Sequence, residues 1–375
     1  MRFLHISDLH IGKKLFHLPL VEDQRCVLDQ IVDLARTVDC VLVAGDVFNR
    51  AQPSQESLAL AGQFFERLAA TGKPVAVIAG NHDSAELIGY CAGVLRAGGV
   101  HAAGSYDGHL KKLTLTDAFG EVDVYLMPFL RPAHVRPWFP EEAIESYADA
   151  VRCALAHAGI DPARRNVLVA HQYVSGAAVC DSEELIVGGV DQIPAGLFDG
   201  FDYVALGHLH TPQKVGEPRV RYSGSPLAYS VSEVRGHSQK SAVIVDMDAR
   251  GGVKLELCPL KPLHPLRELR GTLAELTAQP YCEDYVQVTL TDATLPMDAM
   301  GALRITYPNI VTLRAECMGD GAQELAEIDS VERARPIDHF VEFYRMQNPQ
   351  KELSPRHMRV LEQMFAEVEE EEGMA

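Results

Sequence analysis

Short apolar runs alternate with amphipathic stretches over the first 258 residues of the chain. The runs are nearly continuous in apolar residues and predict strands at Phe3–Ile6, Cys40–Ala44, Pro74–Ala79, Val122–Met127, Val167–Ala170 and Tyr203–Leu206. The amphipathic stretches predict helices at Asp23–Thr37, Ser54–Ala70 and Glu141–His157. Strands without polar alternation are typical of a sheet that is covered on both faces. The pattern therefore indicates an α/β fold.

The pattern changes in the later part of the chain. Three runs follow at shorter intervals and with more polar alternation, which predicts antiparallel strands at Arg219–Ser223, Ser241–Met247 and Val253–Leu257. Pro259–Leu266 then holds three prolines within seven residues, as is typical of a linker. Beyond it, the pattern predicts two helices and two strands, at Thr272–Ala278, Met297–Leu303, Tyr285–Leu290 and Ile310–Arg314. We predict domains at residues 1–260 and 266–335, and a helical segment with an acidic tail at 336–375.

The composition restricts the classes of function. No apolar run approaches the ~20 residues that span a bilayer, and the chain enters its first strand directly, so we expect a cytoplasmic protein without membrane association. The eight cysteines are scattered without a CxxC pair, which is typical of reduced thiols. The net charge of −18 is unusual for a nucleic-acid-binding protein. Any contact with phosphates must therefore come from a local basic surface, metal ions or a partner.

Polar residues of the metal-binding type follow five of the predicted strands. They are Asp8 and His10, Asp46, Asn81-His82-Asp83, His171, and His208 with His210. Loops beyond the carboxyl ends of strands converge in α/β sheets, so these side chains are expected to meet. Gly45, Gly80 and Gly207 precede three of them and permit sharp turns or close approach of the backbone. Each motif alone has an ordinary explanation as a turn or a surface histidine, but their joint placement does not.

Seven of these side chains offer oxygen or nitrogen donors and no thiolate: Asp8, His10, Asp46, Asn81, His171, His208 and His210. That number is too large for one four-coordinate zinc ion. It suits two divalent ions bridged by a carboxylate, with Mn²⁺, Fe and Zn²⁺ all compatible. Two such ions can clamp the attacking and leaving oxygens at a phosphorus atom. His82 is left over, and its protonated imidazole could stabilise the transition state or donate a proton to the leaving oxygen, with Asp83 expected to orient it.

The same motifs carry a resemblance to a known family. Asp8-Leu9-His10, Gly45-Asp46-Val47-Phe48, Gly80-Asn81-His82-Asp83, His171 and Gly207-His208-Leu209-His210 resemble the five-part signature of calcineurin-like metallophosphoesterases. Four longer blocks, "AHQYVSGA", "DSEELIVGG", "FDYVALGHLHTPQ" and "RYSGSPLAYSVSE", are similar to DNA nucleases of that family. The resemblance covers residues 1–260 closely and the later segments more loosely.

The resemblance implies a fold and a set of roles. The fold is a two-sheet α/β/β/α sandwich with a small α/β capping domain and a helical C-terminal tail. Two Mn²⁺ ions are implied, one on Asp8, His10, Asp46 and His210, the other on Asp46, Asn81, His171 and His208. Asp46 would bridge them, and His82 would be the catalytic histidine. Asn49 stands where several members carry a histidine linked to exonuclease action, so the balance of exonuclease and endonuclease activity stays open.

The resemblance also implies partners: an ATPase with a long coiled coil, double-stranded DNA ends and hairpins, and a second copy of the chain. Candidate phosphate contacts are Lys13, Lys14, Arg50, Arg131, Arg136 and Arg164-Arg165. Two apolar helical stripes would dock on the ATPase, formed by Ile337, Phe340, Val341 and Tyr344 and by Met358, Leu361, Met364, Phe365 and Val368. The alternative is that both stripes pack on the capping domain of the chain itself.

Three functions are compatible with these features. The leading one is a metal-dependent DNA exonuclease and endonuclease in repair, recombination and replication. A phosphatase or cyclic-nucleotide phosphodiesterase on the same scaffold is the second, although it would not need the domain after Pro265. A scaffold without catalysis is the third, although it would have no reason to keep the donors together with His82.

Overall fold

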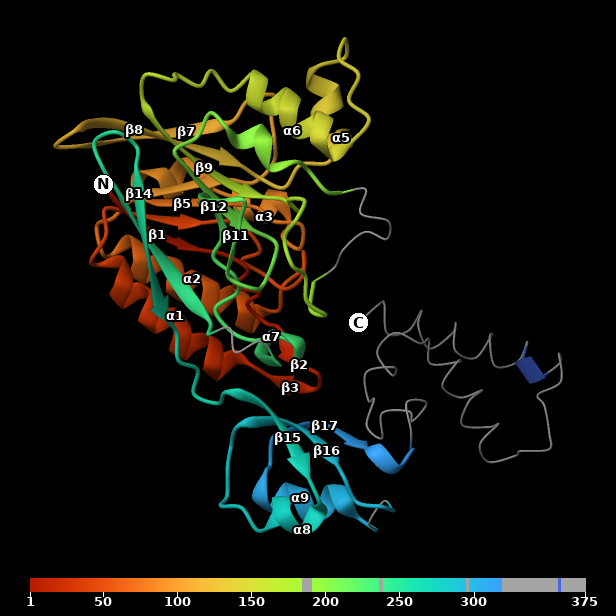
Figure 1. The fold of residues 1–375 in the computed structure, drawn as a ribbon. Coiled ribbons are helices and arrows are strands. Elements are labelled where there is room, and N and C mark those ends of the chain that lie inside the picture. Colours follow the sequence, from red (N-terminus) through yellow and green to blue (C-terminus); the bar gives the residue numbers. More distant parts are fainter. Residues whose placement is uncertain (184–190, 236–238, 295–296, 319–356, 359–375) are drawn as a thin grey trace.

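The computed structural model describes residues 1–183, 191–235, 239–294, 297–318 and 357–358. Its larger part is a pair of six-stranded sheets that pack face to face (Figure 1). The first sheet has the order β14-β13-β1-β4-β5-β6 and the second has the order β11-β12-β10-β9-β8-β7. A hairpin of β2 (Lys14–Leu15) and β3 (Leu18–Pro19) lies outside both sheets.

The strands of the first sheet are β1 (Arg2–Ile6), β4 (Cys40–Val43), β5 (Val75–Ile78), β6 (Val100–Ala103), β13 (Ser241–Met247) and β14 (Val253–Pro259). Those of the second are β7 (Lys111–Asp117), β8 (Gly120–Met127), β9 (Arg165–His171), β10 (Tyr203–Gly207), β11 (Gln213–Val215) and β12 (Glu217–Tyr222). Within each sheet the inner strands that lead to the site, β1, β4 and β5 in one and β9 and β10 in the other, run parallel.

Helices cover the outer face of each sheet. Those on the first sheet are α1 (Val21–Ala35) and α2 (Gln55–Ala69), with the short α3 (Ala85–Gly89) and α4 (Ala92–Ala97) near β6. Those on the second are α6 (Tyr147–Ala156) and α5 (Pro132–Val135), which continues into a 3₁₀ turn at Arg136–Trp138 (Figure 1). One core lies under α1 and α2, another under α6, and a third between the two sheets. The predicted α/β/β/α sandwich is confirmed.

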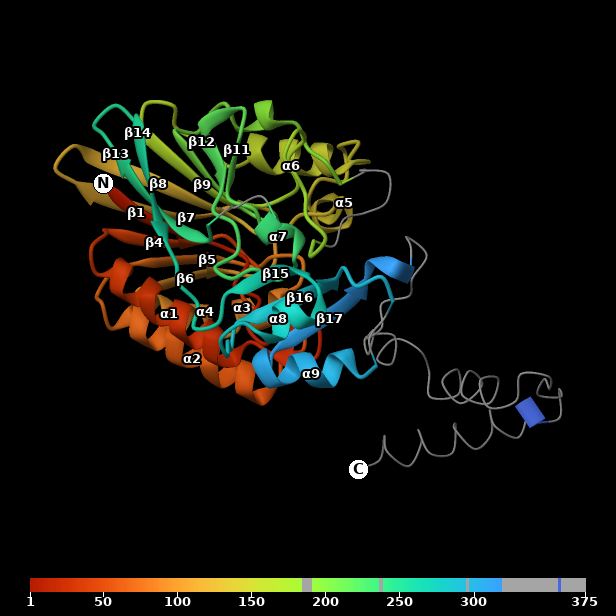
Figure 2. The ribbon, with the colours of Figure 1, turned by 60° about the horizontal axis from the view of Figure 1, so that its bottom comes forward.

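A small second unit follows β14 and lies beside the sandwich (Figure 2). It is a parallel three-stranded sheet of β15 (Leu266–Gly271), β16 (Tyr285–Leu290) and β17 (Ile310–Ala315) with α8 (Leu273–Thr277) and α9 (Ala299–Thr306). It has a core of its own, which includes Val286, Val288 and Leu303. The domain boundaries at 260 and 266 stay a prediction.

Two groups of hydrogen bonds connect this unit to the sandwich. Asp23 of α1 is only 2% exposed and accepts hydrogen bonds from the backbone and ring of His264 and from the Tyr285 hydroxyl, at 2.7, 3.0 and 3.1 Å. Arg235, on the one-turn helix α7 (Ser232–Arg235), makes a bidentate pair with Glu268 of β15. The orientation of the small unit therefore depends on specific side chains as well as on apolar packing.

The structure differs from the predicted elements at several points. β12 runs parallel to β10 and antiparallel only to β11, so the expectation of an antiparallel strand there is half wrong. Six strands were not predicted: β2, β3, β6, β7, β11 and β15. The third predicted helix begins later, because Ser146 caps it in a capping box with Asp149. No helix in the described ranges is both long and apolar enough to cross a bilayer.

Candidate metal centre

The donors predicted from the sequence lie at one edge of the sandwich, where both sheets contribute. Asp8 and His10 follow β1, Asp46 follows β4, and Asn81 follows β5, all in the first sheet. In the second sheet His171 ends β9, and His208 and His210 follow β10. The register pairs Ile6 with Val43 and Gly207 with His171, so the strands of each sheet end at one level. All seven donor side chains are therefore brought together, as the carboxyl ends of parallel strands require.

One oxygen of Asp46 lies between two groups of donors. Its Oδ2 is 3.6 Å from His10 Nε2 and 3.3 Å from His171 Nε2. On the first side, the Nε2 atoms of His10 and His210 approach within 3.0 Å, and Asp8 joins the same cluster. Asp46 is therefore placed where a bridging carboxylate would have to be.

The second group surrounds Asn81. Its Oδ1 is 2.9 Å from His171 Nε2 and 2.9 Å from His208 Nδ1. The other ring nitrogen of His171, Nδ1, is 2.8 Å from the carbonyl oxygen of Ala44 and donates to it, so in the neutral ring Nε2 carries the lone pair that faces the centre. Carboxylate, amide and imidazole donors converge without a thiolate, and this set fits two borderline divalent ions.

Four of the candidate ligands have a strained backbone. Asp8, His10, Asp46 and His208 have φ of 53°, 42°, 52° and 108°. Positive φ is uncommon outside glycine and costs of order 1–3 kcal/mol a residue, so it persists where the surroundings fix it. Here hydrogen bonds fix it: Asp8 N donates to Gly45 O at 3.0 Å, and His208 N donates to Asp8 Oδ1 at 3.0 Å. The loops hold the donors rigidly.

Two glycines permit this close approach of loops. A Cβ on Gly80 would lie 2.1 Å from Asp46 Oδ1, and a Cβ on Gly207 would lie 2.0 Å from Ala44 O and 2.8 Å from His171 Nδ1. Any side chain at either position would displace a candidate ligand. The close backbone approach expected from the sequence is what the structure has at Gly80 and Gly207.

Burial and neighbouring charges set the protonation of the donors. Burial lowers the pKa of His208 to about 3 and that of His10 well below its usual range. Burial opposes ionisation of Asp46, but His171 outweighs it and holds the pKa of Asp46 well below its usual range. Burial alone would lower the pKa of His171, but the charge of Asp46 outweighs burial and raises this pKa to about 9. An ionised Asp46 and neutral imidazoles are the forms that bind metals, and a bound cation would displace the proton from His171.

His82 lies beside this cluster and is partly exposed. Its ring is 4.9 Å from the ring of His10, centroid to centroid, and one of its ring nitrogens groups with His10 and Asp46 as a further donor. Its backbone N–H donates to Asp46 Oδ1 at 2.9 Å, which fixes the position of the residue. A side chain so placed is close to the ligands and still reachable from solvent.

Asp83 has contacts different from those expected. Its carboxylate accepts hydrogen bonds from the backbone of Val47, Phe48 and Gly80, at 3.1, 2.8 and 3.0 Å. Burial, and then the charge of Asp46, raises its pKa to about 7. Since its recorded hydrogen bonds within the described residues all go to backbone amides, Asp83 ties the loop after β4 to the loop after β5. None of these hydrogen bonds reaches the His82 ring, so they do not support the expected role of Asp83 in orienting it.

Two of the predicted phosphate contacts flank the cluster. The ammonium of Lys13 lies 5.4 Å from the ring of Tyr229, which packs edge-on against His10 and His210. On the other side, the guanidinium of Arg131 lies 5.4 Å from the ring of Phe129, which stacks on His208 at 6.3 Å.

The other predicted phosphate contacts have different surroundings from those of Lys13 and Arg131. Lys14 and Arg50 are exposed, and Arg136 donates from Nε to the Ile144 carbonyl at 2.6 Å. Arg164 and Arg165 are not phosphate contacts at this site, because they lie at the start of β9, at the opposite end of the strand. There they pair with carboxylates, Arg165 with Asp117 and Arg164 with Asp123. The predicted partner-binding residues, Met358 apart, lie outside the described residues.

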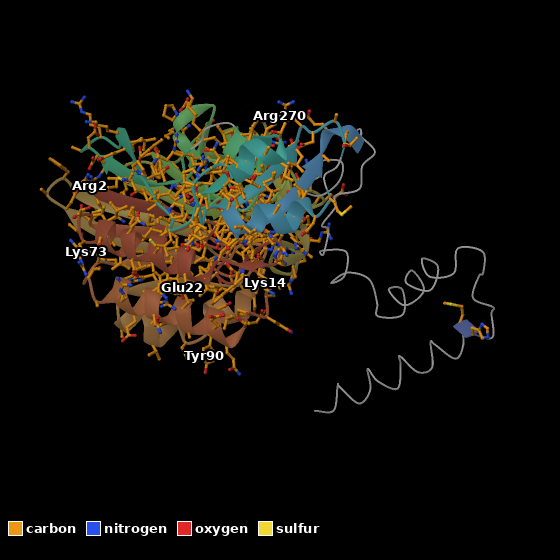
Figure 3. The ribbon with its side chains drawn as sticks, turned by 90° about the horizontal axis from the view of Figure 1, so that it is seen from below. Arg2, Lys14, Glu22, Lys73, Tyr90 and Arg270 are labelled. Carbon is orange, nitrogen blue, oxygen red and sulfur yellow. The ribbon has the colours of Figure 1, made fainter. Side chains whose placement is uncertain are left out.

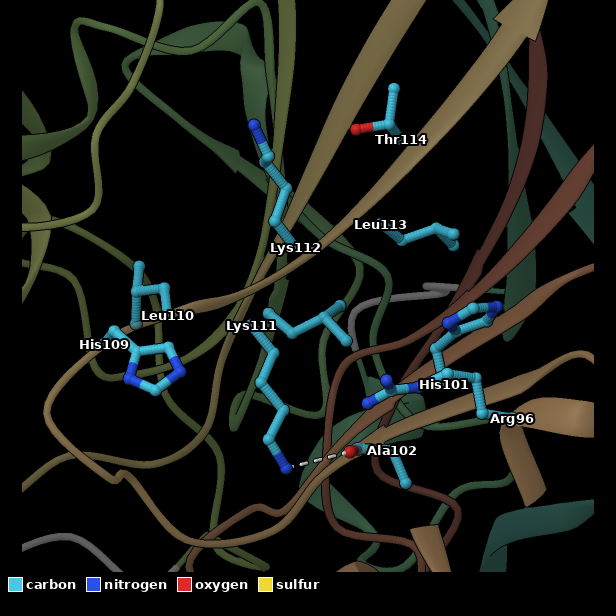
Figure 4. Close-up of a pocket in the computed structure, with 10 residues that line it drawn as sticks. Arg96, His101, Ala102, His109, Leu110, Lys111, Lys112, Leu113 and Thr114 are labelled. Carbon is cyan, nitrogen blue, oxygen red and sulfur yellow. Dashed lines mark hydrogen bonds between the residues drawn. The ribbon is translucent and has the colours of Figure 1, made fainter. Parts of the chain in front are cut away.

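A basic pocket of about 440 Å³ lies between β6 and β7 and was missed in the sequence (Figure 4). Its lining includes Arg96, His101, His109, Lys111 and Lys112. β6 is the strand next to β5 in the first sheet, so the pocket begins one strand beyond the candidate metal centre. The unpredicted strands β6 and β7 supply most of its residues, so the sequence pattern could not predict the pocket.

Comparisons with known proteins agree with this fold. The family model described as calcineurin-like phosphoesterase matches residues 1–212, and one described as type 5 capsule protein repressor C-terminal domain matches residues 262–348. A fold of this kind with such a cluster of donors defines a metal-dependent phosphoesterase, and the chain belongs to the calcineurin-like phosphoesterase family. It is 30% identical over 353 residues to SbcD, a component of the nuclease SbcCD, from Staphylococcus saprophyticus, covering 91% of this chain and 92% of the relative. Within the family, the chain therefore belongs with the SbcD nucleases.

Two solved structures resemble the chain more distantly. One is TT1561 of Thermus thermophilus, with 16% identity, a TM-score of 0.41 and coverage of 69% of this chain and 99% of that one. The other is a dimetal phosphatase from Danio rerio, with 13% identity, a TM-score of 0.37 and coverage of 65% and 92%.

Proposed function

We propose that the chain hydrolyses phosphodiester bonds of DNA ends and hairpins with two Mn²⁺ ions, as the nuclease component of a complex with the ATPase SbcC. It would act in the cytoplasm in repair, recombination and replication of DNA. The observation that carries the proposal is the convergence of seven oxygen and nitrogen donors in two groups with Asp46 between them, and with His82 beside them. The kinship with an SbcD nuclease supports DNA as the substrate.

Each side chain has a role in this mechanism. Asp8, His10 and His210 would hold one ion, and Asn81, His171 and His208 the other, with Asp46 shared. Bound ions would supply Lewis-acid stabilisation of the phosphate and an activated water. His82 would donate a proton to the leaving oxygen, since it is near the ligands and open to solvent.

Lys13 and Arg131 are suited to hold the phosphates of the DNA on either side of the cluster. The basic pocket lined by Arg96 and Lys111 would continue this positive surface beyond β5. Such local cations reconcile DNA binding with a net charge of −18, since phosphate contacts depend on the local and not the total charge. Lys14, Arg50 and Arg136 stay weaker candidates for the same role.

A homodimer is part of the proposal. Tyr90, Val94 and Leu95 lie within six residues of each other around α3 and α4 and are 72%, 73% and 39% exposed. Tyr90 projects from the surface of the sandwich in Figure 3. Large apolar side chains clustered on a surface mark an interface, and a second copy of the chain is the expected occupant.

The metal requirement gives a first expected result. After exhaustive stripping with a chelator, DNA cleavage should vanish, and added Mn²⁺ should restore it several-fold better than Mg²⁺. The reason is that imidazole ligands suit a borderline ion better than a hard one. Initial rates across a series of metal ions measure this. Undiminished cleavage in the stripped protein would contradict the two-metal mechanism.

Substrate preference separates the nuclease from the phosphatase alternative. The specificity constant for a DNA hairpin should exceed that for p-nitrophenyl phosphate by at least about a hundredfold, because contacts remote from phosphorus can stabilise the transition state. Both are measured with the same Mn²⁺-loaded protein, with and without SbcC. Comparable constants would favour a phosphatase, and the absence of any hydrolysis would favour a scaffold.

The segment after Arg335 is proposed as the docking element for the coiled coil of SbcC. A chain truncated after Arg335 should keep its thermal unfolding transition and its Mn²⁺ binding but lose binding to SbcC. The measurements are pull-down, metal content and melting temperature of the full and truncated chains. Retained binding, or failure of the truncated chain to fold, would favour packing of the segment on the capping unit.

A further inference from the structure

His210 is held from behind by a hydrogen-bonded chain of side chains. While its Nε2 faces His10 at 3.0 Å, its Nδ1 points away from the candidate centre and lies 2.6 Å from Ser182 Oγ. The Ser182 hydroxyl donates its only proton to Glu233 Oε1 at 2.5 Å. Ser182 must therefore accept from His210, which places the imidazole proton on Nδ1 and leaves the lone pair of Nε2 for a metal.

Glu233 is an unusual anchor for such a chain. It is only 2% exposed, and its other oxygen, Oε2, pairs with the ammonium of Lys240, which is 8% exposed. The backbone N–H of Tyr229 also donates to Glu233, at 3.0 Å. Burial of this ion pair carries a desolvation cost, and apolar residues of similar size would often serve stability as well. Its presence calls for a role other than stability.

The same charged pair also fixes the main chain of His210. Lys240 Nζ donates to the carbonyl oxygen of His210 at 2.7 Å. The backbone N–H of His210 donates to Glu183 Oε1 at 2.6 Å. Both ends of the residue and its ring are thus held by side chains from two segments, around Ser182 and around Glu233, that are 51 residues apart in the sequence.

The other histidines of the centre lack this support. Among the described residues, Nδ1 of His10 and Nε2 of His208 have no hydrogen-bond partner, and His171 uses only the carbonyl of Ala44. Among the described residues, His210 is therefore the one histidine of the four whose outer ring nitrogen, the one turned away from the centre, is linked to a buried charge. Carboxylates that act on a metal-binding histidine in this manner raise its basicity and fix its orientation.

We propose that Ser182 and Glu233 are positioning residues for His210, and that Lys240 is their charge partner. They keep Nε2 free of its proton and aimed at the ion that Asp8 and His10 would share. The inference rests on the proposed function, because it takes His210 as a ligand. Loss of these hydrogen bonds behind His210 should weaken binding of that ion by about 10–100-fold, the usual effect of such outer contacts.

The experiment compares two serine variants of the full chain. Ser182→Ala removes the hydroxyl that links Glu233 to His210 and leaves only the direct approach of His210 Nδ1 to Glu233 Oε1, at 3.7 Å. Ser230→Ala is the matched control, because the Ser230 hydroxyl also donates to Glu233 Oε1, at 3.3 Å, but has no recorded contact with His210 among the described residues. Mn²⁺ binding is measured by calorimetry and by metal content after dialysis. Unfolding temperatures in chelator serve as the control for folding.

We expect Ser182→Ala to weaken one of two Mn²⁺ equilibria by about 10–100-fold, with Ser230→Ala and Ser182→Thr remaining within about threefold of the unmodified chain. In a His210→Ala background, Ser182→Ala should have no further effect on Mn²⁺ affinity. This coupling distinguishes positioning through His210 from a general structural role.

Three results would overturn the inference. They are wild-type affinity in Ser182→Ala, an equal loss in Ser230→Ala, or an undiminished effect of Ser182→Ala in the His210→Ala background. The proposed function fails in a different manner: without a two-metal site the unmodified chain would bind no Mn²⁺ at all, and a phosphatase would bind Mn²⁺ but show no preference for DNA. Because the readout is binding of the metal, the inference does not depend on which DNA is cleaved.

Discussion

Asp46→Ala is expected to remove both metal ions and to lower DNA cleavage by at least about a thousandfold, the upper range for loss of a single charge-stabilising group. The expectation follows from the position of Asp46 Oδ2 between His10 Nε2 and His171 Nε2, at 3.6 and 3.3 Å. A carboxylate shared by two ions serves both, so neither ion should remain in its absence. Metal content of the purified variant and initial rates on a DNA hairpin measure the two effects.

Asp83→Asn is the matched control for Asp46→Ala. Asp83 is also a buried carboxylate in these loops, but its hydrogen bonds go to the backbone of Val47, Phe48 and Gly80. The control should keep both ions and lose stability, by about 1–3 kcal/mol for donors left unsatisfied. Two ions retained in Asp46→Ala, or both ions lost in Asp83→Asn, would contradict the assignment of Asp46 as the bridge.

The candidate ligands were predictable because each one follows a strand. A buried parallel strand is visible as a continuous apolar run, as in Cys40–Val43, and its end fixes where the next polar residue lies. Parallel strands of one sheet share an edge, so residues far apart in sequence, such as Asp8 and Asn81, could be placed together without knowledge of any contact. The family resemblance then divided the donors into two groups.

Elements without this signal were missed. β7 alternates between half-buried and exposed residues at the edge of its sheet, and its lysines and threonines read as a surface loop. β15 begins directly after Pro265, so the prolines of the linker concealed it. The basic pocket depends on β6 and β7 and was lost with them.

The directions of side chains were the second feature that could not be predicted from the sequence. Asp83 follows His82 in sequence, but its carboxylate turns toward the amides of a neighbouring loop and not toward the imidazole. Likewise, Ser182 and Glu233 lie in two of the blocks that carry the family resemblance, yet their contact spans 51 residues and no local pattern connects them. Sequence position identifies which residues are near a site, whereas their hydrogen-bond partners depend on the tertiary structure.

His82→Ala should lower DNA cleavage by about 10²–10⁴-fold, the usual contribution of a general acid, while both ions stay bound. His82 lies beside His10, 4.9 Å between ring centroids, and is partly exposed, so it can reach a leaving oxygen without being needed for coordination. Metal content and hairpin cleavage of the variant are measured together. An emptied metal site in His82→Ala would show that the imidazole is a ligand.

The leaving group offers a sharper test of the proton donor. A nucleoside p-nitrophenyl phosphodiester expels p-nitrophenolate, which is stable as an anion and needs no proton. The loss caused by His82→Ala should therefore fall to about tenfold or less on this diester, against about 10²–10⁴-fold on DNA. His82→Gln, which keeps a polar side chain but has no acidic proton to give, should behave as His82→Ala on both substrates. An equal loss on both substrates would mean that His82 stabilises charge at the phosphorus centre and does not protonate the leaving oxygen, since only the latter role depends on the basicity of that oxygen.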